Sequence, residues 1–180
     1  RDAMIFSDGA AAVVLEKTDS SEGGMLAHES ATYAIEEANY IYFGESFNPE
    51  DTKNTKYIKM LGRKIYEFAL TNVPLAMKAC LDKSKVDISN IKKILIHQAN
   101  EKMDEAIIQR FYKLYGLDMP ENIMPMSINK LGNSSVATVP TLYDLILKGE
   151  LENHSINKGD HIIFASVGAG MNINAIIYQV

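Results

Sequence analysis

This sequence of 180 residues is poor in several features that define other protein classes. It has one cysteine, so it cannot form an internal disulfide, and a reducing, cytoplasmic compartment is expected. No apolar run approaches the roughly 18 residues that span a bilayer, and no basic segment leads into an apolar one as in a signal peptide. The 23 acidic residues outnumber the 18 basic ones and leave no basic stripe for a nucleic-acid backbone. We therefore expect neither a membrane nor a nucleic acid among its partners.

Metal-binding patterns are missing as well. His28, His154 and His161 show no mutual ligand spacing. Cys80 lies on an apolar helical stripe with Ala76, as a buried structural cysteine does. No internal repeat or low-complexity segment is visible. The sequence thus predicts no metal site.

The composition is typical of a globular domain, and the first residues suggest that an upstream part is missing. The hydrophobic fraction of 47% and the charged fraction of 23% are ordinary for one packed domain of this length. The chain opens with "RDAMIFSDGAAAVVLEK", without an initiator methionine and almost at once in an apolar run. A natural N-terminus seldom enters a core strand without a lead-in. We therefore expect that an upstream part of the protein is missing.

The order of apolar patterns is ββ-α-β-α-α-ββ, and helices between apolar strands predict an α/β layered domain. Turns are expected at 20–24 and 87–90, and a long excursion of the chain at 34–55. Pro74 should kink or divide the first helix. The expected strands are 10–15, 25–33, 93–96, 162–167 and 172–178, and the expected helices are 58–81, one from the Asn100 cap to the Gly116 stop, and 136–147.

Three polar groups stand at strand or loop ends, where sites form in α/β sheets. They are "HQAN" at 97–100, "GNSS" at 132–135 and "GAG" at 168–170. A histidine and an asparagine amide can both donate to one carbonyl oxygen, and such an oxyanion site contributes a few kcal/mol to catalysis. Backbone amides in a glycine turn can form a second one. Taken singly, each group also fits an ordinary turn.

Together these motifs resemble a known family. "ILIHQAN", "NKLGNSSVATVP" and "GAGM", with "SDGAAAVVLE" and "MLGRKIYEFAL" upstream, are similar to the C-terminal half of β-ketoacyl-[acyl-carrier-protein] synthase III, of the thiolase superfamily. The resemblance covers essentially all 180 residues. It implies a thiolase-like α/β domain at 1–180, with a mixed β-sheet of about five strands layered with helices. It also implies an absent N-terminal half that carries a nucleophilic cysteine.

The resemblance implies a decarboxylative Claisen condensation of an acyl-CoA primer with malonyl-[acyl-carrier protein], which gives a 3-oxoacyl thioester and initiates fatty acid synthesis. His97 and Asn133 fall on the family's catalytic histidine and asparagine, which stabilise the enolate oxygen. The backbone N–H of Ala169 falls where the family holds the oxyanion of the attacked thioester. Acyl-CoA is a substrate, and no cofactor is implied.

Further contacts follow from the same resemblance. Asn100 corresponds to an asparagine near the pantetheine arm, and Gly168 and Gly170 flank the oxyanion turn against the substrate. Lys102 stands where the family often has an arginine that meets the carrier protein, although a solvated lysine fits equally well. Arg63 is a weaker candidate for a contact with the pantetheine arm, CoA or the carrier protein.

The sequence departs from the family at three positions around the turn. Ala169 stands where the family usually has glycine, and Val167 and Met171 replace aromatic residues. These changes leave the acyl-chain preference open. A second cysteine near the turn, which would mark a thiolase, is absent, and Asn133 stands where elongating ketosynthases have a second histidine.

The partners implied are acyl carrier protein, acyl-CoA, the N-terminal half and a second copy of the full-length chain in a homodimer. Because Cys80 is expected to be buried and the nucleophilic cysteine belongs to the absent N-terminal half, the chain alone should be inactive. The alternative function is a non-catalytic thiolase-fold module that binds carrier protein or a partner subunit.

Overall fold

A four-stranded mixed β-sheet is the centre of the computed structural model, which describes residues 5–17 and 23–180. The strand order is β1-β6-β5-β4, with β4 and β5 parallel and the other neighbours antiparallel. The predicted strands at 25–33, 93–96, 162–167 and 172–178 are therefore confirmed. The observed bounds are Gly24–Thr32 for β1, Ile91–Ile96 for β4, His161–Gly168 for β5 and Asn172–Gln179 for β6.

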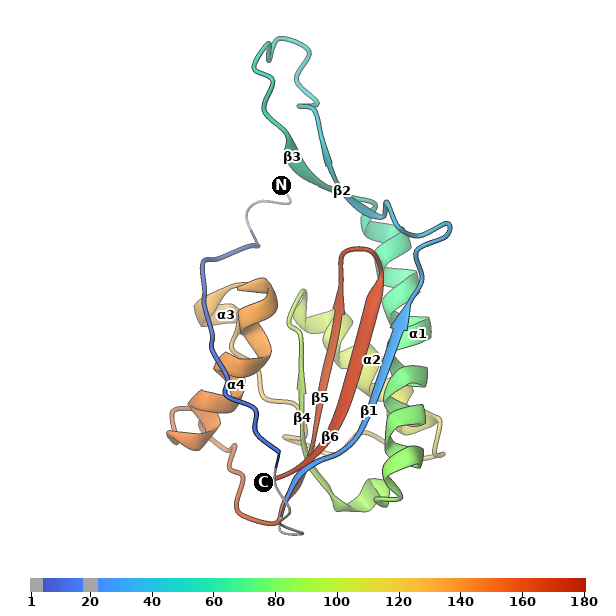
Figure 1. The fold of residues 1–180 in the computed structure, drawn as a ribbon, viewed down its shortest axis with the longest axis vertical. Helices are drawn as coiled ribbons and strands as arrows, with labels where there is room; N and C mark the ends of the chain where they lie inside the picture. Colours follow the sequence, from blue (N-terminus) through green and yellow to red (C-terminus); the bar gives the residue numbers. More distant parts are fainter. Residues whose placement is uncertain (1–4, 18–22) are drawn as a thin grey trace.

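Helices cover both faces of this sheet (Figure 1). Helices α1 (Gly62–Ser84) and α2 (Glu101–Lys113) pack against each other, and α1 covers β1, β6 and β5. Helix α4 (Thr138–Leu147) lies over β4 and β5 on the other face. The shorter helical elements are η2 (Ile88–Asn90), α3 (Ile128–Leu131) and η3 (Ser135–Ala137).

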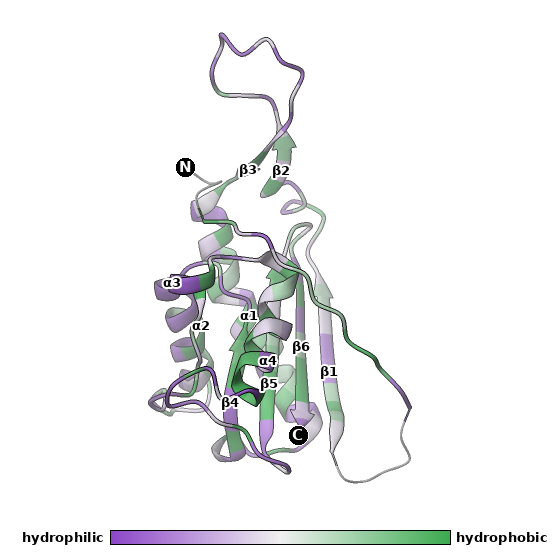
Figure 2. Cartoon of the chain, turned by 90° about the vertical axis from the view of Figure 1, so that its left-hand side faces the viewer, coloured by the Kyte–Doolittle hydropathy of each residue, from purple (hydrophilic) through white to green (hydrophobic). Residues whose placement is uncertain are grey.

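The apolar run at the end of β4 follows from these layers. Successive side chains of a strand point to opposite faces of the sheet. Ile94 and Ile96 join the core under α1 and α2, whereas Leu95 packs in a second cluster with Leu142 and Ile146, both of α4. A strand buried on both faces needs a continuous apolar sequence. Figure 2 shows this concentration of hydrophobic residues on β4, β5 and α4.

A two-stranded ribbon extends from the end of the sheet where β5 turns into β6 (Figure 1). Its strands are β2 (Ile41–Gly44) and β3 (Tyr57–Met60), which pair antiparallel. The predicted helix start at 58 is wrong, because residues 57–60 pair with 41–44 instead. Leu61 precedes the first helical residue, Gly62.

The predicted buried strand at 10–15 is also wrong. This segment has no regular secondary structure and is exposed, with Val14 at 95% of its full accessibility. It runs past α4 outside the sheet, as a visibly hydrophobic stretch (Figures 1 and 2). Among the described residues no strand pairs with it, and a strand needs such a partner for its backbone groups. Residues 20–22 of the predicted turn at 20–24 lie outside the described residues.

Pro74 does not divide the first helix, so that part of the prediction is wrong. The α1 helix runs through it from Gly62 to Ser84. Proline lacks the N–H that would bond the carbonyl four residues earlier. That carbonyl belongs to Leu70, and Arg110 of α2 donates to it from Nη1 at 3.2 Å. A guanidinium from the neighbouring helix thus replaces the missing backbone donor.

Replacing Arg110 with methionine is expected to lower the free energy of unfolding by about 1–2 kcal/mol, since the Leu70 carbonyl loses its charged donor. In a Pro74→Ala background the restored backbone N–H can reach that carbonyl, so Arg110→Met should then have a smaller effect. Urea unfolding of the four proteins measures this coupling. Lys113→Met, an exposed cation on the same helix, is the matched control. Equal effects of Arg110→Met in both backgrounds would contradict the assignment.

Candidate functional site

His97 follows the last residue of β4 and lies where the chain leaves the sheet. Its backbone N–H still donates to the Ala165 carbonyl of β5 at 2.9 Å, which fixes the start of the turn. The side chain is partly buried. Burial lowers the pKa of the His97 ring, and a backbone group of Ser135 raises it in part. The ring is therefore held neutral near pH 7, a form that carries one N–H donor and one acceptor.

Asn133 is held from two sides. Its backbone forms a parallel bridge to Phe6, in which the Ser7 N–H donates to the Asn133 carbonyl at 2.9 Å and the Asn133 N–H to the Ile5 carbonyl at 2.8 Å. The residue is 3% exposed. Its side-chain Oδ1 accepts from the Ser135 N–H at 2.8 Å. Because the amide oxygen is engaged, the Nδ2 donors are the part that can serve a ligand.

Ser135 joins the two candidate catalytic side chains. Its N–H binds Asn133, and its backbone acts on the ring of His97. The residue has φ +56°, in the left-handed region that residues other than glycine seldom adopt. Such conformations persist where the surrounding structure enforces them, and they concentrate at functional sites. The structure thus brings His97 and Asn133 to a single backbone residue.

Gln98, to which the sequence assigned no role, connects the two loops. Its side chain is fully buried. Nε2 donates to the Pro125 carbonyl at 2.8 Å, and Oε1 accepts from the N–H groups of Ser127 and Ile128, each at 2.9 Å. These three bonds connect the turn at 97–100 to residues 125–128, which lead into α3 and so toward Asn133. Sequence periodicity cannot predict these bonds, because the pattern around a glutamine at a strand end is the same whether its side chain is buried or exposed.

The turn at 168–170 lies at the same edge of the sheet, because β4 and β5 are parallel and both end there. Gly168 ends β5, and Gly170 has φ +72°, which glycine adopts without strain. Ala169 is exposed, and its carbonyl accepts from Asn172 Nδ2 at 3.1 Å. The backbone of this turn is therefore open to a ligand on its outer side.

The remaining predicted contacts are more exposed. Asn100 is confirmed as the cap of α2, since its Oδ1 accepts from the Met103 N–H at 3.2 Å. Lys102 is exposed on the same helix. Arg63 lies in the first turn of α1, where it pairs with Glu67 at 2.9 Å. In Figure 1 the start of α1 lies at the end of the sheet that holds the β5–β6 turn.

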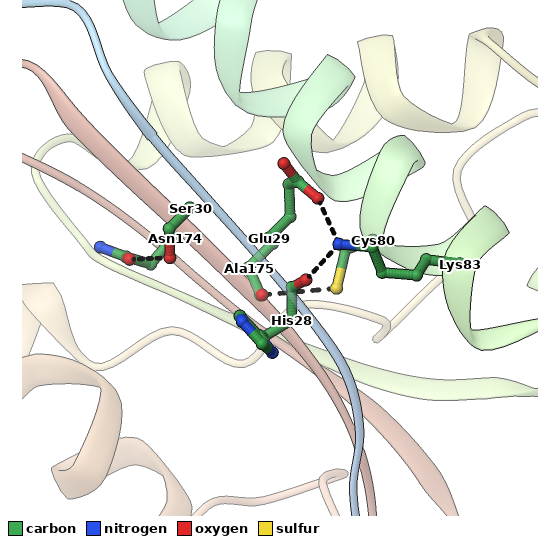
Figure 3. A network of polar contacts seen from close by, with 7 residues as sticks. All are labelled: His28, Glu29, Ser30, Cys80, Lys83, Asn174 and Ala175. Carbon is green, nitrogen blue, oxygen red and sulfur yellow. Dashed lines mark hydrogen bonds and ion pairs between the residues drawn. The ribbon is translucent and has the colours of Figure 1, made fainter.

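Cys80 is fully buried, as expected, and its thiol donates to the Ala175 carbonyl at 3.3 Å (Figure 3). Burial raises the pKa of the thiol, which opposes formation of the thiolate that a nucleophile needs. Beside it, Lys83 pairs with Glu29 and donates to the His28 carbonyl (Figure 3).

In residues 5–17 and 23–180, no group of three or more histidine, cysteine or acidic side chains is placed to hold a metal ion. None of the helices in that part of the chain is long and apolar enough to cross a membrane.

The chain is similar to known proteins over almost its whole length. The family model for the C-terminal part of 3-oxoacyl-[acyl-carrier-protein (ACP)] synthase III matches residues 81–180, which include all three polar groups. Beta-ketoacyl-[acyl-carrier-protein] synthase III of Clostridium botulinum is 33% identical over 181 residues, which is 96% of this chain and 51% of the relative. The corresponding protein of Oenococcus oeni is 29% identical, over 98% of this chain and 52% of the relative. The chain thus spans about half the length of these relatives.

Solved structures show the fold independently. The 3-oxoacyl-[acyl-carrier-protein] synthase III of Aquifex aeolicus superposes with a TM-score of 0.70 at 21% identity, covering 91% of this chain and 46% of that one. The Thermus thermophilus enzyme gives 0.70 at 23% identity, over 91% and 48%. The fold is therefore thiolase-like, with four strands in the sheet and a separate two-stranded ribbon. With the family match over 81–180, this chain belongs to the 3-oxoacyl-[acyl-carrier-protein] synthase III family.

Proposed function

We propose that this chain is the C-terminal half of a synthase that condenses an acyl-CoA primer with malonyl-[acyl-carrier protein] to a 3-oxoacyl thioester, the first step of fatty acid synthesis. The observation that carries the proposal is the convergence of His97 and Asn133 on the backbone of Ser135, beyond the end of β4. Each side chain carries an N–H group, and in this proposal both donate to one substrate oxygen.

The chemistry requires such a pair. When the malonyl thioester loses carbon dioxide, the electron pair of the broken C–C bond moves onto the thioester oxygen and forms an enolate. A ring N–H of His97 and the Asn133 Nδ2–H donate to that oxygen, which lowers the barrier because both groups are held beside it before the reaction. The enolate carbon then attacks the acyl thioester, and the Ala169 N–H holds the resulting oxyanion. Collapse of this oxyanion restores the carbonyl and breaks the C–S bond, so the cysteine sulfur leaves as thiolate and the 3-oxoacyl thioester is released.

The substrates reach this site along the exposed residues around it. Asn100, Gly168 and Gly170 line the path of the pantetheine arm. Lys102 and Arg63 offer cations to an acidic carrier protein, of which Lys102 is the better placed, since Arg63 already pairs with Glu67. Both substrates arrive as activated thioesters, so the reaction needs no cofactor. Full-length protein functions as a homodimer in this proposal.

The nucleophile belongs to the N-terminal half. Cys80 cannot supply it, because its thiol is fully buried, donates to the Ala175 carbonyl and has a raised pKa. The chain 1–180 alone is therefore inactive, and His97 and Asn133 complete a Cys-His-Asn site only in the full-length protein.

Mass spectrometry of full-length protein with acyl-CoA and malonyl-[acyl-carrier protein] tests this proposal. We expect 3-oxoacyl-[acyl-carrier protein] from the full-length protein and none from residues 1–180. Labelled acyl-CoA should not modify Cys80 in either. Acylation of Cys80 would refute the assignment of the nucleophile. If the full-length protein binds carrier protein but forms no 3-oxoacyl product, the chain is instead part of a non-catalytic module.

A further inference from the structure

The buried face of α2 contains an aspartate that the proposed reaction does not use. This face is otherwise apolar at Met103, Ile107, Ile108 and Phe111, all of which belong to the main core. Asp104 lies on the same face and is 0% exposed. Aspartate is almost never fully buried unless it is paired. Its position therefore needs a reason other than packing.

The carboxyl of Asp104 is poorly satisfied. Among the described residues, neither of its oxygens has a hydrogen-bond partner of good geometry. Burial raises the pKa of this carboxyl to about 8, and the backbone N–H groups of Ala99 and Asn100 act in the opposite direction. Glu101, one turn earlier on the same helix, is the charged group that acts on it, and its negative charge raises the pKa further. Asp104 is thus mostly a neutral acid at pH 7.

The position of this acid relative to the candidate site is specific. Asp104 is in the first turn of α2, and helical side chains point toward the N-terminus of their helix. Its carboxyl accordingly faces back toward the N–H groups of Ala99 and Asn100, in the turn that carries His97. The same turn is fixed by Gln98, whose three hydrogen bonds reach the 125–128 segment. Asp104 and Gln98 are thus two buried polar side chains that adjoin the turn carrying His97.

We propose that Asp104 is a positioning residue for His97, whose buried neutral carboxyl orders the backbone at 99–100 and thereby the direction of the imidazole ring. The catalytic consequence rests on the proposed function. Ionisation places a charge in an apolar site. Because the pKa is raised overall, the cost of burying this charge exceeds what the N–H groups of Ala99 and Asn100 recover, so we expect the carboxylate to move toward water and to loosen the turn. A buried acid with a raised pKa binds its proton more tightly in the folded state, so stability falls as pH rises from the unfolded value near 4 to about 8.

Asp104→Asn in the full-length protein tests this proposal, because the amide keeps the size and polarity of the neutral acid and cannot ionise. Two readouts are compared with wild type between pH 6 and 9: amide hydrogen exchange at residues 97–100, corrected for its intrinsic pH dependence, and kcat for condensation. In wild type we expect local exchange to rise at least tenfold and kcat to fall on the alkaline side. Both changes should be absent in Asp104→Asn.

Three further variants sharpen the experiment. Glu105→Gln, an exposed acid one residue along the helix, should behave as wild type. In Glu101→Gln, the alkaline fall in kcat and the rise in exchange should both occur at lower pH, because the substitution removes a charge that raises the pKa of Asp104. Asp104→Leu fills the apolar site and remains available if the asparagine variant does not fold; it should show fast exchange at 99–100 at every pH.

The outcomes separate cleanly. Identical pH profiles of exchange and kcat in wild type and Asp104→Asn would overturn the proposal. A change in global stability alone, with exchange at 97–100 and the kcat profile unaltered, would overturn it too, since Asp104 would then be only a buried acid. If full-length wild type does not condense its substrates, the proposed function fails, and the exchange experiment still decides whether Asp104 orders the turn.

Discussion

Replacing Asn133 with alanine in the full-length protein is expected to lower kcat for condensation by about 10²–10³-fold, the range found when one oxyanion donor is removed. His97→Ala should have an effect of the same order, since in the proposed mechanism both side chains donate to one enolate oxygen. Acylation of the nucleophile by acyl-CoA should continue in both variants, because it precedes the decarboxylation. Rapid quenching with labelled acyl-CoA and malonyl-[acyl-carrier protein] separates the two steps.

A second substitution distinguishes the donor role of Asn133 from its structural role. The Oδ1 atom binds the Ser135 N–H, so alanine removes that bond together with the donor. Asn133→Asp keeps an acceptor for Ser135 and replaces the donor with a negative charge that repels the enolate. It should therefore be as inactive as the alanine variant while retaining more stability. Asn90→Ala, at the opposite end of β4, serves as the control. Retained condensation in His97→Ala and Asn133→Ala would contradict the assigned roles.

Gln98→Met should be the most destabilising substitution near the site. It leaves the N–H groups of Ser127 and Ile128 and the Pro125 carbonyl without their partner, in a place where the side chain is fully buried. Each unsatisfied buried group costs about 1–3 kcal/mol, so we expect a loss of about 3 kcal/mol or more in the free energy of unfolding. Urea denaturation measures this loss, and condensation by the surviving folded fraction should also fall.

Gln98→Glu provides the comparison that isolates the hydrogen bonds. The introduced carboxyl can still accept from Ser127 and Ile128, but it can donate to the Pro125 carbonyl only when it is protonated. Its stability should therefore recover as pH falls, whereas that of Gln98→Met should show no such recovery. Gln109→Met, an exposed position on α2, should leave stability within about 0.5 kcal/mol of wild type. A small effect of Gln98→Met would mean that the two loops are held together by other contacts.

The parts of the fold that the sequence predicted are those in which local pattern and tertiary environment agree. Strands β4, β5 and β6 each contain an apolar run, at 94–96, 162–165 and 175–178. Asn100 caps α2, as its residue type suggests. The segment 10–15 has the same apolar pattern as β4, but the pattern carries no information about a partner strand. Pro74 obeys the rule that it removes a hydrogen bond, and Arg110, from a distant part of the sequence, supplies the replacement.

The candidate site could likewise be predicted only in part. The motifs at 97–100 and 132–135 are recognisable, but the contacts that connect them are not. Gln98 and Asp104 are polar residue types that are normally found at the surface, and both are fully buried. Leu114, an apolar residue next to helix α2, is 41% exposed, whereas Asp104 of that helix is 0% exposed. Burial of a polar side chain depends on groups far along the chain, so sequence periodicity cannot predict it.

The left-handed backbone of Ser135 also determines which sequence changes the site can tolerate. At φ +56° glycine, asparagine or aspartate can replace serine with little strain, whereas a β-branched residue such as valine is disfavoured there. The hydroxyl is not what joins His97 to Asn133, because both contacts use the backbone. The relative placement of the two candidate catalytic side chains therefore depends on the backbone conformation at 135, and not on the serine hydroxyl.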